Sequence, residues 1–239
     1  DIPLEMLSGK QLQQAQVART KQTIVDKAAI RRFLDSLWYP LCFLDFETFS
    51  VPIPPYDGLR PYQQVPFQYS LHILERDDAN PQHREFLATP GIDPRSQFVE
   101  HLLKDIPKGA CILVYNQSFE SGRLNELAEW FPDQRTELLG LVDNMRDLML
   151  PFKDRSLYHW KQQGSYSIKK VLPAFVDNLS YEGLAIADGG TAMDAYQRMC
   201  EVKDDLEVLD KLRAELFAYC QMDTLAMAEL IRAFERLLN

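Results

Sequence analysis

The first half of the chain alternates short apolar runs with turn-forming residues. Each run has the aliphatic, aromatic or β-branched composition that favours a strand, and the runs cover residues 40–48, 66–75, 84–88 and 110–115. A helix is expected between the third and fourth runs, beginning at Pro94 and ending before Pro107. The sequence therefore predicts a group of strands interrupted by one helix.

Helical periodicity dominates after residue 116. The last helix shows it most clearly, because mostly apolar residues recur at steps of three and four: Leu209, Leu212, Leu216, Tyr219, Asp223, Met227, Leu230, Phe234 and Leu237. At the other end of the chain, residues 8–36 are predicted to form a largely polar helix. Three strands, a helix, a fourth strand and then helices together predict an α/β fold, a sheet layered with helices.

Composition and length are those of an ordinary soluble protein. The 239 residues are 46% hydrophobic and 26% charged, and no apolar stretch approaches the roughly 18–20 residues of a membrane span. The four cysteines form no CxxC motif, and no signal peptide is visible, so we expect reduced thiols and a cytoplasmic protein without a membrane partner.

The chain is expected to comprise two parts. Residues 1–38 are predicted to be an N-terminal helical linker segment, and residues 39–239 are predicted to form the main domain. Because the chain starts at Asp1 rather than Met, and continues with a polar helix, we expect it to be a segment of a longer protein. The net charge of −9 argues against a broad basic surface, although metal ions can bring phosphates to an acidic site.

Two acids interrupt the first apolar run. Asp45 and Glu47 are two residues apart on a predicted strand, so their side chains point to the same side. Two buried like charges cost on the order of several kcal/mol, and a divalent cation removes that penalty. The alternative is a strand end where both carboxylates reach water or pair with arginine.

Two more acids occupy helix faces that are otherwise apolar. Glu120 is in line with Leu124 and Leu127, although acids are also common in first turns for their interaction with the helix dipole. Asp223 takes a position in the last helix where a leucine is expected, one turn after Tyr219. A boundary aspartate bonded to serine or arginine is the alternative there. If all the acids converge, they suit a pair of divalent ions that promote phosphoryl displacement.

These motifs resemble those of the DEDD exonucleases of the ribonuclease H-like superfamily. The Asp-x-Glu-Thr motif of that family matches Asp45, Glu47 and Thr48, and its second motif matches Asn116, Phe119 and Glu120. Glu120 is a departure, since the family usually has aspartate there. Tyr219 and Asp223 match the Tyr-x-x-x-Asp motif of the tyrosine subgroup.

The resemblance covers roughly residues 40–235, and each motif by itself is weak. It identifies the main domain, residues 39–239, as a ribonuclease H-like exonuclease domain. The YNQSFE, GSYSIKKVLP and YCQMDTLAM segments also resemble an uncharacterised bacterial family whose members often carry an upstream nuclease-like domain. The fold implied is a mixed sheet, three antiparallel strands followed by parallel strands, with flanking helices and a long C-terminal helix.

The activity implied is metal-dependent 3′–5′ exonuclease cleavage of single-stranded DNA or RNA. Two Mg²⁺ or Mn²⁺ ions would be held by Asp45, Glu47, Glu120 and Asp223, with Asp45 between them, because oxygen ligands suit hard cations. Tyr219 would orient the attacking water. Thr48, Asn116 and Phe119 are expected near the substrate.

A further substrate contact is expected in the GSYSIKKVLPAF segment. Ser165 or Ser167 is a candidate helix cap, and the helix N-terminus together with Lys169 and Lys170 would favour a phosphate. A solvated lysine pair is the alternative.

Two other functions remain open from the sequence. Because Glu120 replaces the usual aspartate and the net charge is acidic, the domain would alternatively bind nucleic acid or a partner protein without cutting it. An endonuclease of the same superfamily is the third hypothesis.

Overall fold

The computed structural model describes residues 3–76, 80–202 and 204–238, and it is built around a five-stranded mixed sheet. The strands lie in the order β4-β3-β2-β5-β6, with bounds β2 Leu41–Phe49, β3 Val65–Leu74, β4 Gln82–Leu87, β5 Cys111–Val114 and β6 Met145–Asp147. The pairs β2–β3 and β3–β4 are antiparallel, whereas β2–β5 and β5–β6 are parallel. The four expected strands and the α/β class are therefore confirmed. β6 was not predicted, because its three residues carry no apolar pattern.

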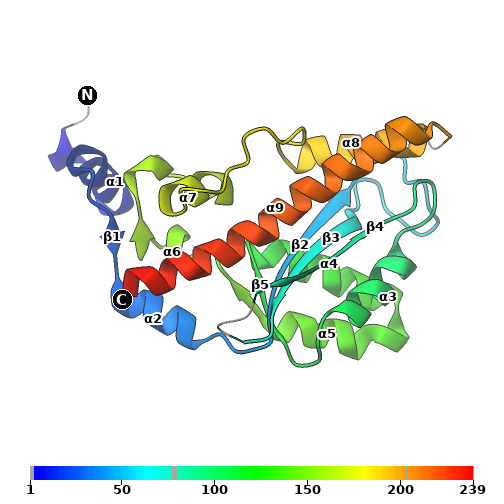
Figure 1. Cartoon of the computed structure of the whole chain (residues 1–239), viewed down its shortest axis with the longest axis horizontal. Helices are drawn as coiled ribbons and strands as arrows, with labels where there is room; N and C mark the ends of the chain where they lie inside the picture. Colours follow the sequence, from blue (N-terminus) through cyan, green and yellow to red (C-terminus); the bar gives the residue numbers. More distant parts are fainter. Residues whose placement is uncertain (1–2, 77–79, 203, 239) are drawn as a thin grey trace.

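Helices flank the sheet, and a long helix crosses it (Figure 1). The helices are α1 Gly9–Thr20, α2 Lys27–Asp35, α3 Arg95–Asp105, α4 Gln117–Trp130, α5 Arg135–Asp143, α6 Leu150–Lys153, α7 Ile168–Phe175, α8 Gly189–Glu201 and α9 Leu206–Leu238, with short 3₁₀ turns at Leu4–Met6, Pro132–Gln134 and Trp160–Gln162. The expected long C-terminal helix is thus confirmed as α9.

The side chains of β2 divide between two apolar cores. Cys42, Leu44 and Phe46 pack in the core that includes residues of α3, α4 and α5. Leu41 and Phe43 face the other way, into the core formed with α2, α7 and the C-terminal half of α9. Alternation along the strand gives Asp45 the same direction as Leu41 and Phe43. The first acid of β2 is therefore turned toward α9.

The single helix expected over residues 8–36 is wrong. Lys21 adopts a left-handed conformation with φ 59° and ends α1, and β1 Ile24–Val25 then pairs antiparallel with β7 Leu157–Tyr158. Asp26 starts α2 by accepting a hydrogen bond from the backbone N–H of Ala29 at 2.9 Å. The β-branched residues around Ile24 and the capping aspartate explain the break.

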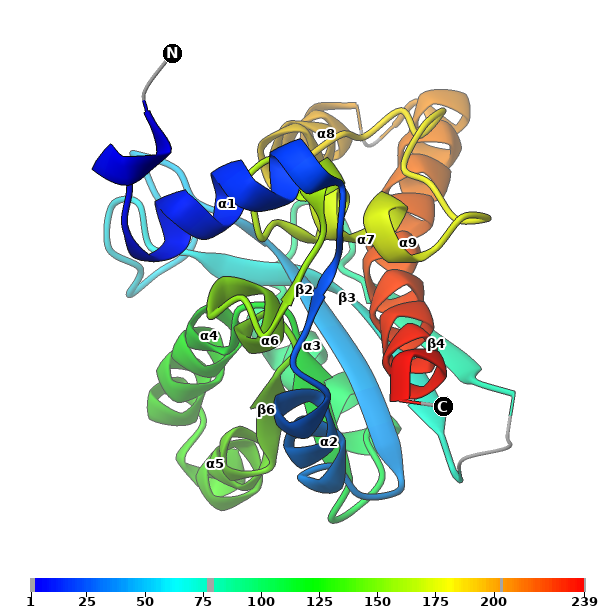
Figure 2. The same cartoon turned by 90° about the vertical axis from the view of Figure 1, so that its left-hand side faces the viewer.

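Both N-terminal helices contact the rest of the chain. Ile30 of α2 is fully buried, and the rings of Phe33 and Phe234 meet edge to face with centroids 6.0 Å apart. On α1, Gln14 accepts a hydrogen bond from Arg155 at 3.2 Å. Figure 2 shows α1 lying across one side of the molecule. Part of the expected linker segment is thus packed against the domain.

Within residues 3–76, 80–202 and 204–238, no helix is both long enough and apolar enough to cross a membrane.

The packing of α2 generates a stability prediction. Ile30→Ala removes a fully buried side chain, and we expect it to lower the free energy of unfolding by about 2–4 kcal/mol in urea denaturation. Arg31→Ala, an exposed neighbour on the same helix, is the control and should change stability by less than about 0.5 kcal/mol. Equal effects of the two substitutions would contradict the integration of α2 into the core.

Candidate metal centre

Two carboxylates of β2 meet beside α9. Glu47 is 6% exposed and Asp45 is half-buried, and their oxygens lie within 4.8 Å of one another and of the Cys220 Sγ. The β2–β3 register shifts between Glu47 and Thr48, so the strand becomes irregular directly after the pair. As their spacing of two residues predicts, the two carboxylates lie close together on the same side of β2.

Glu120 joins this cluster from the first turn of α4. It is 2% exposed, and its Oε2 has no hydrogen-bond partner among the described residues. The chain enters α4 through Asn116, which has a left-handed φ of 87°. Asp147 at the end of β6 holds this turn, because its Oδ1 accepts from the backbone N–H groups of Asn116 at 3.0 Å and Met149 at 2.9 Å. The turn thus directs a carboxylate inward rather than to solvent.

The last helix contributes Tyr219 and Asp223, one turn apart and both buried. The Tyr181 hydroxyl donates to Asp223 Oδ1 at 2.6 Å. The Lys169 Nζ donates to the Tyr219 hydroxyl oxygen at 3.0 Å and also to the carbonyl of Ala187. The tyrosine therefore has a partner on α7, and the aspartate has one in the segment between α7 and α8.

These groups surround a cleft of about 240 Å³. Its walls are formed by Asp45, Phe46, Glu47, Tyr115, Phe119, Ile168, Lys169, Gly189, Tyr219, Asp223 and Met227. Among the described residues of these walls, Lys169 is the one cationic side chain. A Cβ placed on Gly189 would lie 3.5 Å from Glu47 Oε2, so α8 begins close to the carboxylates.

Some of the predicted site residues line the cleft, and others do not. Phe119 and Lys169 lie on the walls of the cleft, together with three of the four predicted ligands and Tyr219. Glu120 is buried next to them, since its charge acts on that of Asp45. The other predicted substrate contacts do not line the cleft: Thr48, Asn116, Ser167 and Lys170.

Each of these four residues has a local reason for its position. Thr48 is the next residue after Glu47 on β2, beyond the irregularity, and is half-buried. Asn116 is exposed, and its side-chain oxygen accepts from Ser118 at 2.8 Å. Ser167 precedes α7 but makes no side-chain capping bond, and Lys170 is exposed. The structure does not test their roles with substrate, which stay predictions.

Three residues near the site were not identified from the sequence. Tyr181 lies in an irregular segment where no periodicity marks it, and Asp147 is the last residue of the unpredicted β6. Cys220 lies next to Tyr219 and is fully buried, but the scattered cysteines of the chain were expected only to be reduced thiols. An acid at the end of a short parallel strand was the one signal that would have identified Asp147.

Burial and mutual repulsion raise the pKa values of the acids. Desolvation is the main cause for Asp45, followed by the charges of Asp223, Glu47 and Glu120, and the pKa of Asp45 lies well above its usual range. Burial also raises the pKa values of Glu47 and Asp223. The Lys169 ammonium acts in the opposite direction on both of these carboxyls. For Glu120, burial raises the pKa to about 8. The protein alone does not compensate these charges.

Cys220 behaves as a donor in this cluster. Burial, and then the charge of Asp45, raise the pKa of its thiol well above the usual range, so the thiol stays protonated. The thiol contacts the Asp45 carbonyl and Oδ2, each at 3.8 Å. The Cys220 Sγ lies beside the carboxylates of Asp45 and Glu47 and could join them as a ligand, but most of the possible ligand atoms are carboxylate oxygens, which suit a hard cation.

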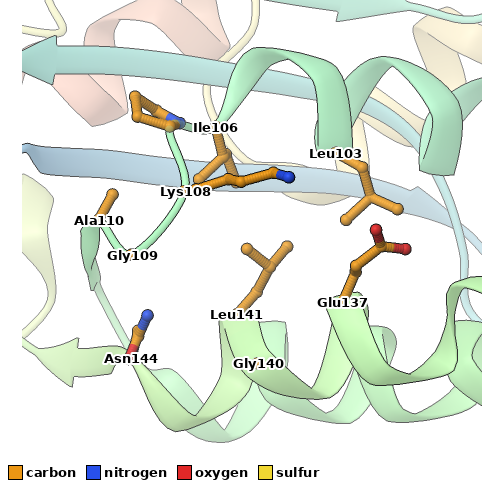
Figure 3. Close-up of a pocket in the computed structure, with 10 residues that line it drawn as sticks. Leu103, Ile106, Lys108, Gly109, Ala110, Glu137, Gly140, Leu141 and Asn144 are labelled. Carbon is orange, nitrogen blue, oxygen red and sulfur yellow. The ribbon is translucent and has the colours of Figure 1, made fainter.

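Another cavity, of about 330 Å³, lies at the opposite end of β5 (Figure 3). It is bordered by the end of α3, the 106–110 segment and α5, and Lys108 and Glu137 are its charged residues. No acid of the β2–α4–α9 cluster reaches it. The predicted chemistry therefore belongs to the smaller cleft.

The raised pKa of Glu120 generates a stability prediction. Between pH about 4.5 and 8 the unfolded chain ionises Glu120 whereas the folded chain keeps its proton, so the free energy of unfolding falls as pH rises. In the presence of a metal chelator, Glu120→Gln should be about 1–4 kcal/mol more stable than the unsubstituted protein at pH 8. At pH 4.5 the two proteins should have nearly the same free energy of unfolding. Urea denaturation at both pH values measures this.

The exposed Glu129 on the same helix provides the control, and Glu129→Gln should show no such difference. An equal effect of Glu120→Gln at both pH values would refute the raised pKa.

Comparison with known proteins gives relatives without a described activity. A family profile described as "Domain of unknown function (DUF2779)" matches residues 42–167, more than half of the chain. This range includes Asp45, Glu47 and Glu120 and ends before Lys169. No solved structure matches the chain.

The curated relatives are bacterial and longer. The chain is 28% identical to the uncharacterised protein UU173 of Ureaplasma parvum, over 77% of this chain and 30% of the relative. It is 27% identical to the uncharacterised MG366 homolog of Mycoplasma pneumoniae, over 83% of this chain and 33% of the relative, and 25% identical to the uncharacterised protein MG366 of Mycoplasma genitalium, over 82% and 32%. The chain thus spans about a third of the length of the curated relatives it matches. By its match to the family profile, it belongs to the DUF2779 family.

Proposed function

We propose that this chain is a metal-dependent 3′–5′ exonuclease with a ribonuclease H-like fold, of the tyrosine subgroup of DEDD enzymes. Its substrate is single-stranded DNA or RNA, and its cofactor is a pair of Mg²⁺ or Mn²⁺ ions. The observation that carries the proposal is the convergence of acids from three elements: Asp45 and Glu47 of β2 and Asp223 of α9 line one cleft, and Glu120 of α4 is buried beside them. The order of the mixed sheet supports the fold assignment.

The residues present fit divalent cations. Among the described residues, Glu120 Oε2 is buried without a hydrogen-bond partner, and the charges of Asp223, Glu47 and Glu120 raise the pKa of Asp45, so the cluster lacks sufficient positive charge. Cations would remove this repulsion and be held by the carboxylates of Asp45, Glu47, Glu120 and Asp223. When bound, such ions stabilise the charge that develops on the attacking and leaving oxygens of a phosphoryl displacement.

Tyr219 positions the attacking water in this proposal. Its hydroxyl oxygen accepts from Lys169, and its hydroxyl also makes a hydrogen bond that lowers the pKa of Asp223, so the group is fixed beside a predicted metal ligand. Burial, followed by the nearby carboxylates, raises the pKa of Tyr219, and the phenol therefore stays neutral. A neutral, fixed hydroxyl orients water rather than removing its proton.

Lys169 adds a positive charge to the substrate side of the cleft. Its ammonium lies 4.8 Å from the centre of the Tyr219 ring, and its positive charge lowers the pKa values of Glu47 and Asp223. A phosphodiester entering the cleft would meet this cation together with the Phe119 ring, which offers a stacking surface for a base. These contacts fit a nucleic-acid strand but leave both DNA and RNA as substrates.

The first test of the proposed function is cleavage of a 5′-labelled oligonucleotide in Mn²⁺. The protein should shorten it stepwise from the 3′ end, and Asp45→Asn should lower the rate roughly a thousandfold or more, since it removes a ligand charge without changing shape. The control is Glu137→Gln at the other cavity, which should keep full activity.

Three results would redirect or overturn the proposal. Full activity of Asp45→Asn would refute the role of the acid cluster. Opening of a circular single strand would indicate an endonuclease. Binding of the oligonucleotide without cleavage would favour the non-cutting module that the longer Glu120 side chain suggests.

The neighbouring lysines offer a second test. Lys169→Met should lower kcat/KM at least about tenfold, because it removes the cation of the cleft and the donor to Tyr219. Lys170→Met, which removes an exposed charge from the same helix, should lower it less than about threefold. Steady-state kinetics on the same oligonucleotide compares them. Equal losses would indicate general electrostatic attraction of the strand instead of a specific role for Lys169.

A further inference from the structure

Tyr181 contacts the acid cluster from outside the motifs that define it. Its hydroxyl donates to Asp223 Oδ1 at 2.6 Å, and its ring lies 5.6 Å from the Lys169 ammonium. A hydrogen bond of this length to a buried carboxylate is strong, because the acceptor is charged or shares the donor's proton in a site with little water. Tyr181 therefore acts on the orientation of a predicted metal ligand.

The backbone around Tyr181 is held in a tight turn. The Leu184 N–H donates to the Tyr181 carbonyl at 3.3 Å, and Gly183 between them has a φ of 90°, which favours glycine. The Glu182 N–H also donates to the Ser180 hydroxyl oxygen at 3.0 Å. The turn fixes the backbone position of Tyr181 in a segment without helix or strand.

The side chain of Tyr181 is fixed by packing as well. Tyr181 and Leu184 pack against both apolar cores, the one beneath α3, α4 and α5 and the one beneath α9. A residue that orients a ligand needs such support, because a mobile donor does not define a carboxylate's direction. Tyr181 meets this requirement from a segment that connects α7 to α8.

We propose that Tyr181 is a positioning residue of the metal centre, fixing the Asp223 carboxylate in the direction in which it binds a divalent cation. This inference rests on the proposed function. Hydroxyl and amide groups that hydrogen-bond to metal ligands orient them and tune their affinity, and their removal typically costs 10–100-fold in metal affinity. Tyr181 does not contact the substrate in this account.

The test is calorimetric titration with MnCl₂ of Tyr181→Phe, which removes one oxygen atom and keeps the ring. We expect Mn²⁺ affinity to fall about 10–100-fold, with an unfolding temperature close to that of the unsubstituted protein. The matched control is Tyr56→Phe. The Tyr56 hydroxyl also makes one hydrogen bond, to the Ile92 carbonyl at 3.0 Å, but Tyr56 lies outside the acid cleft. Its loss should leave Mn²⁺ affinity unchanged.

The possible results separate the inference from the proposed function. Mn²⁺ binding by Tyr181→Phe as tight as, or tighter than, that of the unsubstituted protein overturns the role of Tyr181 and leaves the metal centre intact. An equal loss of affinity in Tyr56→Phe also overturns it, since the effect would then be general. If the unsubstituted protein takes up no Mn²⁺, the proposed function fails and this inference fails with it.

Discussion

The proposed metal site depends on several carboxylates that lie close together inside the protein. Asp45, Glu47, Glu120 and Asp223 are buried or half-buried, and the charges of the other three acids raise the cost of ionising Asp45. Lys169 is the cationic side chain on the cleft walls, and one ammonium does not neutralise four carboxylates. Such an arrangement is unfavourable for stability by itself, which is why it indicates a site made for added positive charge.

The fold supplies the rigid elements that make this concentration of charge possible. β2 is a central strand with neighbours on both sides, and α9 crosses the sheet over the face to which Asp45 points. Asp147 holds the turn before α4 by a hydrogen bond, and Tyr181 and Leu184 pack the segment between α7 and α8 against the apolar cores. The carboxylates thus come from well-packed elements, and they are supported by Asp147 at the end of β6 and by Tyr181 in a connecting segment.

Residues that interrupt a clear apolar pattern could be identified from the sequence, whereas residues outside any periodic pattern could not. Asp45 and Asp223 were recognisable because each interrupts an apolar strand or helix face. β6 is three residues long and Tyr181 lies in an irregular segment, so neither carries a periodic signal. Adjacent positions such as Lys169 and Lys170 point in different directions from a helix, and their spacing alone did not say which one enters the cleft. The predicted helix over residues 8–36 failed because a short β-branched stretch and a capping aspartate outweighed its general helical character.

The most direct measurement of the central claim is anomalous diffraction from a crystal of the protein soaked in MnCl₂. The account predicts two Mn²⁺ peaks between the carboxylates of β2, α4 and α9, with oxygen atoms of Asp45, Glu47, Glu120 and Asp223 as ligands. A map without Mn²⁺ at this cleft, with the carboxylates instead protonated or paired to Lys169, would contradict it.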